Sequence, residues 1–291
     1  MIDVSRETSI FFLFNMEISH KILYNIIIFK VGGVILGKAI AIFNQKGGVG
    51  KTTTNINLAA CLALKGKNVL ILDIDPQGNT TSGIGVSKKK LKKTVYNILV
   101  DDEFDPREAI IKTSVKNLDL IPASVDLAGA EVELVQIEGR EKALKNGLDK
   151  IRDNYDYIFI DCPPSLGLLT INSLAAVDSV LIPIQCEFYA LEGVSQLVST
   201  IELVKKSLNP QLEVQGVILS MFDGRTNLSA QVVQEVKKYF GGKVYSTVIP
   251  RNVRLAEAPS FGLPITEYDP KSRGAEAYTD FAEEFLEQEE E

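Results

Sequence analysis

The chain has 291 residues, of which 45% are hydrophobic and 24% charged, proportions typical of a globular protein with a sizeable core. Its formal net charge of −7 excludes a uniformly basic nucleic-acid-binding protein, although a local basic face is compatible with it. The three cysteines, Cys61, Cys162 and Cys186, form no C-x-x-C pair, which indicates a reducing compartment and no disulfide framework. The one histidine, His20, lies outside the predicted core, so we expect the chemistry to depend on carboxylates, lysines and a metal ion.

Residues 1–37 are predicted to be an extension ahead of a single domain that covers residues 38–291. Its two apolar runs, 10–14 and 26–29, are separated by charged residues and fall short of the roughly 20 residues that a membrane span needs. It also lacks the basic start and the cleavage site of a signal peptide. Two interpretations stay open: a disordered extension, or a segment upstream of a start at Leu36, because a leucine codon can initiate translation in bacteria.

The stretch from Lys38 to Thr54, KAIAIFNQKGGVGKTTT, predicts a buried strand, a phosphate-binding loop and a helix. The loop glycines carry no side chain that would hold the backbone away from a polyphosphate. The amides at the start of the helix would then face the phosphates. Lys51 is expected to reach the β- and γ-phosphate oxygens, and the Thr52 hydroxyl to coordinate Mg²⁺. The predicted nucleotide-binding residues of this segment are Lys46, Gly47, Gly48, Val49, Gly50, Lys51, Thr52 and Thr53.

The loop departs from the common P-loop pattern, which has glycine where this chain has Gln45. In addition, a second lysine, Lys46, lies inside the loop. This segment resembles the deviant Walker A motif of the ParA/MinD group of dimeric ATPases. The resemblance implies that Lys46 crosses a nucleotide-sandwich dimer to the partner's phosphates, in a role like that of an arginine finger.

A helix over 51–65 is expected to end at Gly66, and a buried parallel strand over 68–75 follows it. In an open α/β sheet, ligand-binding groups gather at the carboxyl ends of the strands. Asp73 and Asp75, at the end of this strand, are therefore expected at the phosphate site.

The segment from Asp73 to Asn79 resembles switch I of ParA/Soj proteins. That resemblance implies that Asp75 positions or activates the attacking water, whereas the alternative from the sequence alone is that Asp75 caps the next helix. The lysine run in Ser87–Lys93 is interpreted first as a solvated loop, and a contact to DNA is the alternative.

The middle of the chain predicts short helices over 94–100 and 106–112 and a strand over 118–122. A long helix is expected over 126–152, with an interruption at Gly139 left open. Its expected role is packing and the surface of a dimer.

The segment over 155–164 has the form of a Walker B motif, an apolar strand that ends in Asp161. Such a carboxylate holds Mg²⁺, usually through a coordinated water, because a hard cation prefers oxygen ligands. The two prolines after it resemble the start of switch II. A buried strand over 180–184 and an amphipathic helix over 191–208 are expected next.

The last third predicts strands over 214–221 and 244–249, a helix over 228–239 and the motif PRNVRLAEAPS at 250–260. With this motif, the resemblance to the ParA family, Soj branch, extends from about residue 38 to 285. It implies an α/β fold: a doubly wound, mostly parallel sheet flanked by helices, as in P-loop NTPases of the deviant Walker A type.

The same resemblance assigns two further pairs of residues. Pro250 and Asn252 would line the adenine pocket, and Arg225 and Arg254 would hold the DNA backbone in the ATP-bound dimer. The alternative for either arginine is an exposed or intramolecular ion pair. DNA binding of this kind is sequence-independent and weakens steeply with salt.

The resemblance predicts a cytoplasmic, nucleoid-associated and Mg²⁺-dependent ATPase, slow and stimulated by a partner, that acts in chromosome or plasmid segregation. Its expected partners are a second copy of the chain, nonspecific double-stranded DNA and a ParB/Spo0J-type centromere-binding protein. DnaA is a further candidate partner, through control of replication initiation.

Two other classes fit the sequence less well. A MinD-like division-site ATPase ends in a basic amphipathic helix that lies on lipid, whereas residues 281–291 are strongly acidic and no membrane contact is expected. An iron–sulfur carrier needs a pair of thiolates at the dimer axis, and the separated Cys162 and Cys186 provide no such motif.

Overall fold

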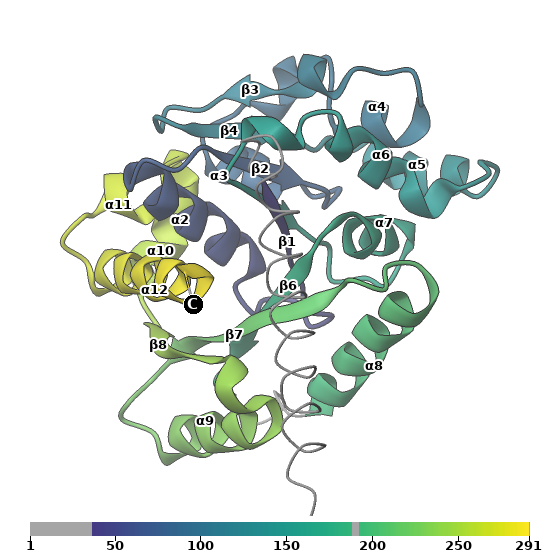
Figure 1. Cartoon of the computed structure of the whole chain (residues 1–291). Helices are drawn as coiled ribbons and strands as arrows, with labels where there is room; N and C mark the ends of the chain where they lie inside the picture. Colours follow the sequence, from purple (N-terminus) through teal and green to yellow (C-terminus); the bar gives the residue numbers. More distant parts are fainter. Residues whose placement is uncertain (1–36, 188–191, 291) are drawn as a thin grey trace, which may run out of the picture. The chain divides into compact units, whose positions relative to one another are not determined.

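The computed structural model describes residues 37–187 and 192–290. The predictions for the extension before Gly37, and the first residue of the helix expected over 191–208, lie outside the described residues. The described part contains one eight-stranded sheet, in the order β3-β4-β2-β5-β1-β6-β7-β8 (Figure 1). Its strands are β1 Lys38–Ile42, β2 Val69–Asp73, β3 Ile111–Lys112, β4 Leu118–Ile121, β5 Tyr157–Asp161, β6 Ser179–Gln185, β7 Glu213–Phe222 and β8 Val244–Pro250.

Every neighbouring pair in the sheet is parallel except β3 and β4, so the prediction of a mostly parallel sheet is confirmed. The central strand β1 pairs with β5 on one side and with β6 on the other. Such a switch point opens a crevice at the carboxyl ends of the strands. The loop after β1 therefore begins where a ligand is expected to bind.

Helices cover both faces of the sheet. They are α2 Lys51–Leu64, α3 Asn79–Gly83, α4 Val95–Val100, α5 Leu127–Leu134, α6 Ala143–Asp149, α7 Leu168–Ala176, α8 Glu192–Ser207, α9 Asn227–Phe240, α10 Val253–Glu257, α11 Ile265–Tyr268 and α12 Arg273–Glu290. Figure 1 shows α2, α11 and α12 on one side of the sheet and α7 and α8 on the other.

Successive residues of the central strand face opposite sides of the sheet. Ala39 and Ala41 belong to the core under α4 to α9, whereas Ile40 and Ile42 belong to the core under α2 and α12. This alternation is the period of two expected of a strand that is covered on both faces. It explains why the apolar run at 39–43 is continuous.

Two predictions from the middle of the chain need comment. The helix expected over 106–112 is wrong in its second half: a 3-10 turn over Pro106–Ala109 gives way to β3, which pairs antiparallel with β4. A two-residue edge strand has no periodicity of its own, and only the pairing with β4 defines it. The interruption at Gly139 is confirmed, because this residue separates α5 from α6 and has a left-handed φ of 73°.

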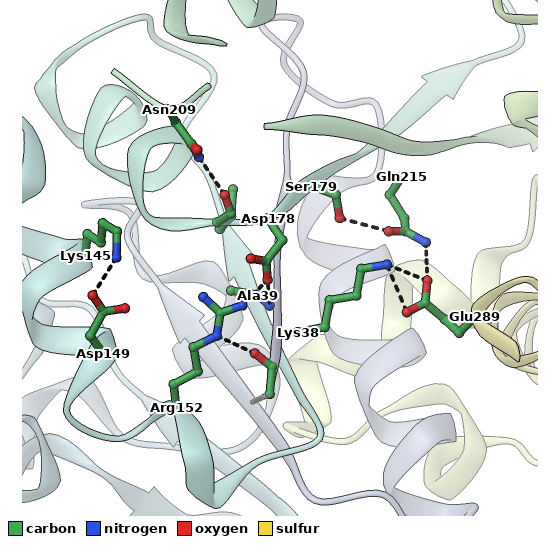
Figure 2. Close-up of polar contacts among 12 residues, drawn as sticks. Lys38, Ala39, Lys145, Asp149, Arg152, Asp178, Ser179, Asn209, Gln215 and Glu289 are labelled. Carbon is green, nitrogen blue, oxygen red and sulfur yellow. Dashed lines mark hydrogen bonds and ion pairs between the residues drawn. The ribbon is translucent and has the colours of Figure 1, made fainter. Parts of the chain in front are cut away.

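The carboxyl-terminal helix α12 is part of the core. Phe281 and Phe285 are fully buried, and the ring of Phe285 lies 5.4 Å from that of Tyr157 on β5. Near its end, Glu289 accepts hydrogen bonds from Lys38 Nζ at 2.7 Å and from Gln215 Nε2 at 2.7 Å (Figure 2). The apolar face of α12 is therefore occupied by the sheet.

Replacement of Phe285 by alanine is expected to destabilise the fold by about 3–5 kcal/mol, because it leaves a cavity in a fully buried cluster. A loss of this size lowers the melting temperature by roughly 10 °C or more, which calorimetry would measure. Glu287→Ala, on the exposed face of the same helix, is the matched control and should change little. Equal melting temperatures for the two variants would contradict the packing described for α12.

Within residues 37–187 and 192–290, no helix is both long and apolar enough to span a membrane.

Candidate nucleotide-binding site

A cavity of about 570 Å³ opens at the carboxyl ends of β1, β2 and β5. The glycine-rich loop, the segment after β2 and the loop after β5 form its walls. Its lining residues are Gly47, Gly48, Gly50, Lys51, Thr52, Thr53, Asp75, Pro76, Gln77, Asn79, Pro163, Pro164, Ser165 and Met221. The fold thus brings most of the predicted loop residues together with Asp75.

The glycines of the loop have the geometry of an anion cradle. Gly48 and Gly50 have φ values of 74° and 92°, in the left-handed region that disfavours side chains. A Cβ built on Gly47 or Gly48 would meet nothing within 4 Å, so the backbone borders open space there. Helix α2 starts directly after Gly50 and has no side-chain cap, which leaves its first amides available to an anion.

Lys51 is buried, with 7% of its surface exposed, and its Nζ donates a hydrogen bond to the Lys46 carbonyl at 3.1 Å. Burial lowers its pKa, and the charge of Asp161 partly opposes that effect. Among the described residues no carboxylate lies within 4 Å of its Nζ to form an ion pair. A phosphate in the cradle would supply the missing negative charge.

The other two predicted loop residues lie differently. The side chain of Val49 is buried, and its carbonyl accepts a hydrogen bond from Ser220 Oγ at 2.8 Å, so it can contribute only its main chain. Lys46 does not line the cavity, and its amide donates to Asn44 Oδ1 at 2.9 Å. The prediction that the Lys46 side chain reaches the phosphates bound to a second subunit stays a prediction.

Asp161 is buried at the end of β5, and its two carboxylate oxygens differ. Oδ2 accepts hydrogen bonds from Thr52 Oγ1 at 2.7 Å and from Thr80 Oγ1 at 2.8 Å, whereas Oδ1 is buried without a partner in the described part of the chain. Burial raises the pKa of Asp161 to about 6. A carboxylate with an unused oxygen beside a threonine hydroxyl fits the oxygen-rich surroundings of Mg²⁺.

Asp73 and Asp75 end up in different positions, contrary to the expectation that both serve the phosphate site. Asp73 is fully buried and accepts hydrogen bonds from the amide and the hydroxyl of Thr81, each at 2.7 Å. Burial, together with the charge of Asp161, raises its pKa to about 7. Asp73 therefore anchors α3 rather than lining the cavity.

Asp75 lines the cavity and also stabilises a turn. Its Oδ1 accepts a hydrogen bond from the Gln77 amide at 2.9 Å, and its carbonyl accepts one from the Gly78 amide at 2.8 Å. The local role differs from the predicted alternative, because α3 begins after Gly78 and Asp75 caps the turn before it.

A second cavity of about 330 Å³ adjoins the first and shares Gly50, Thr53 and Met221 with it. Pro250 and Asn252 line it, together with mostly apolar residues, as expected of a pocket for a flat base. Asn252 Oδ1 caps α10 by accepting a hydrogen bond from the Arg254 amide at 2.7 Å.

Sequence reasoning missed two residues of this region. Met221 lies between the cavities with a φ of 51°, and strained backbone of this kind clusters at functional sites. Thr80 shares Asp161 with Thr52. Nothing in the sequence marks Met221, whereas the hydroxyls after the switch I segment could have drawn attention to Thr80.

Arg225 and Arg254 are exposed and lie outside both cavities. Arg225 pairs with Asp223 through Nη2 at 2.7 Å, and Arg254 pairs with Glu257 through Nη1 at 2.9 Å. Both arginines therefore form the intramolecular ion pairs that were the alternative to DNA contact. Exposed pairs contribute little to stability, so a phosphate group can replace either carboxylate at small cost.

A parallel sheet with a glycine-rich cradle after its central strand, and a buried carboxylate at the end of the neighbouring strand, defines a P-loop nucleotide-binding protein. Residues 37–214 match the model of an AAA domain family. The chain is 64% identical over 249 residues to the sporulation initiation inhibitor protein Soj of Bacillus subtilis, covering 86% of this chain and 98% of Soj. It is 53% identical over 255 residues to the chromosome partitioning protein ParA of Myxococcus xanthus, covering 88% and 90%.

Among solved structures, cobyrinic acid a,c-diamide synthase from Mycobacterium smegmatis with bound ADP and magnesium superposes with a TM-score of 0.75 at 39% identity, covering 85% of this chain and 93% of that one. The chain belongs to the ParA/Soj family of chromosome-partitioning ATPases, and the predicted family is confirmed.

Proposed function

We propose that the chain is an ATP-driven switch for DNA partitioning, in which residues 38–291 act as a single ATPase domain. The observation that carries the proposal is the open glycine cradle beside Asp161 Oδ1, an oxygen without a partner among the described residues, because the two combine an anion site with a carboxylate suited to a metal. ATP joins two copies of the chain, the dimer holds double-stranded DNA without sequence preference, and hydrolysis releases it.

Each residue of the site has a defined task in this proposal. The loop amides and Lys51 bind the triphosphate, and Pro250 and Asn252 border the base. Thr52 would hold Mg²⁺ directly, and Asp161 would hold it through a water. The metal neutralises charge on the β- and γ-phosphates when it is bound.

Hydrolysis depends on two further side chains. The carboxylate of Asp75, on the cavity wall, accepts a hydrogen bond from the attacking water and so orients it toward the γ-phosphate. Lys46 of one subunit approaches the phosphates of the other and stabilises the charge that develops there.

The family relationship also supports the proposed partners. A ParB/Spo0J-type centromere-binding protein would stimulate hydrolysis, and DnaA is a further candidate. We place the protein in the cytoplasm on the nucleoid. A MinD-like attachment to lipid is disfavoured, because the apolar face of α12 is buried and its other face is acidic.

Arg254→Glu tests the DNA-binding step. It is expected to weaken DNA binding by the ATP form by roughly tenfold or more, because the dimer loses one phosphate contact from each subunit, and to leave ATP-driven dimerisation unchanged. DNA co-sedimentation with ATP and light scattering would measure the two properties. Arg107→Glu, on the exposed Pro106–Ala109 turn, is the control for the added negative charge. Wild-type binding to anionic liposomes in place of DNA would overturn the proposed function.

A further inference from the structure

The lysine run after α3 has no task in the nucleotide site. Lysines occupy five of the six positions from 88 to 93, and all five side chains are exposed. In the part of the chain that the structure describes, none of them pairs with a carboxylate. Like charges at this density repel one another, and a bound polyanion would remove that repulsion.

The run is attached to the fold at both ends. Lys88 Nζ donates a hydrogen bond to the carbonyl of Gln77 at 2.7 Å, and Gln77 lines the phosphate cavity. At the other end, Lys93 Nζ lies 5.0 Å from the centre of the Phe104 ring, which is a cation–π distance. Between these anchors, Lys89 and Lys90 on the turn over Lys88–Lys90, and Lys92 after it, are exposed to solvent. The lysines are therefore displayed on an anchored turn.

The run also adjoins the surface that carries Arg254. A Cβ built on Gly85, just before the run, would lie 2.9 Å from the carbonyl of Gly262. Gly262 ends the 3-10 turn that follows α10, the helix of Arg254. Arg254 Nε lies 3.3 Å from Asp269, and the exposed Lys271 and Arg273 follow Asp269 in the chain. The contact between Gly85 and Gly262 thus connects the lysine run, which follows Gly85, with the segment that carries Arg254 before Gly262 and Lys271 and Arg273 after it.

We propose that the lysine run is a second contact for the DNA backbone, continuous with the surface around Arg254. This inference rests on the proposed function, since it adds a surface to the same DNA-bound state. Flexible ammonium groups, with Leu91 partly buried between them, suit phosphates and not base edges. An acidic protein partner would need apolar contacts as well, which the run does not offer.

The triple variant K89Q/K90Q/K92Q tests the proposal and leaves the anchoring Lys88 and Lys93 in place. The ATP form should lose roughly tenfold or more in DNA affinity at moderate salt. The slope of log affinity against log salt should fall by about 0.9 for each phosphate contact removed. Fluorescence anisotropy with a labelled duplex at several salt concentrations measures both quantities, and light scattering with ATP monitors the dimer.

The matched control is K67Q/K116Q/K243Q, which removes the same charge next to the amino ends of β2, β4 and β8, at the far end of the sheet. It should change DNA binding little. Wild-type affinity and salt slope in K89Q/K90Q/K92Q would overturn the lysine-run proposal while the proposed function stands. Loss of the ATP dimer in that variant, or binding of wild type to polyglutamate that matches its binding to DNA, would also overturn it. Absence of DNA binding by wild type would instead reject the proposed function.

Discussion

Lys51→Met is expected to abolish nucleotide-dependent DNA retention and to weaken ATP binding by about 100-fold, or ~3 kcal/mol. The buried ammonium has no carboxylate partner in the described chain, and the phosphates are the charge that it is placed to meet. Titration with a fluorescent ATP analogue measures the affinity, and co-sedimentation measures retention. Full retention of DNA by the variant would contradict the assignment of the glycine-rich loop to the nucleotide-binding site.

The same substitution should not weaken the nucleotide-free fold. Burial lowers the pKa of Lys51, because the ammonium group loses hydration when the chain folds. Methionine fills a similar space without a charge, so the melting temperature of the nucleotide-free protein should stay the same or rise. Lys67→Met, at a half-exposed site just after α2, is the control and should leave ATP binding intact. A marked loss of stability in Lys51→Met would indicate that the ammonium serves the fold.

Asp75→Ala is expected to slow ATP hydrolysis by about 100-fold or more, the size typical of a lost proton-accepting group. ATP binding should persist, because in the described residues the carboxylate accepts a hydrogen bond from the Gln77 amide, and the bond from the Gly78 amide goes to the main-chain carbonyl, which the variant keeps. The ATP-bound dimer should therefore accumulate. Phosphate release and light scattering with and without ATP would measure the two effects, and a persistent monomer would contradict the switch.

Asp75→Asn separates the two roles of this residue. Its side-chain oxygen can still accept the hydrogen bond from the Gln77 amide, so the turn remains capped, whereas the negative charge is lost. Slow hydrolysis in both variants would assign Asp75 to the reaction. Normal hydrolysis in Asp75→Asn would show that the reaction needs only a hydrogen-bond acceptor at this position and not the negative charge.

The elements around the cradle could be predicted because their signals are local. The continuous apolar runs of β1, β2 and β5 are long enough to mark buried strands, and the glycines between β1 and α2 mark a loop. Strand β3 escaped prediction because two residues carry no periodic signal and the hydrogen bonds that define it come from β4. The sequence pattern from Pro106 onward is equally compatible with a short helix and with the observed turn and strand.

The site was predictable to a lesser extent. Asp75 and the cradle follow from a strand end and a glycine pattern, and the structure places them at one cavity. The difference between Asp73 and Asp75 depends on α3, whose Thr81 binds the first carboxylate inside the protein. Met221 carries no sequence signal because its relevance comes from a backbone angle at the boundary of two cavities.

The sequence by itself determined the class of protein, the order of the strand, loop and helix, and the residue types that meet a phosphate and a metal. Only the tertiary structure decided which groups share a partner: the hydroxyls of Thr52 and Thr80 donate to one oxygen of Asp161. The physical reason is that these contacts join segments that are distant in the chain. The order of the strands brings β5 between β1 and β2, and a pattern of neighbouring residues contains no information on that order.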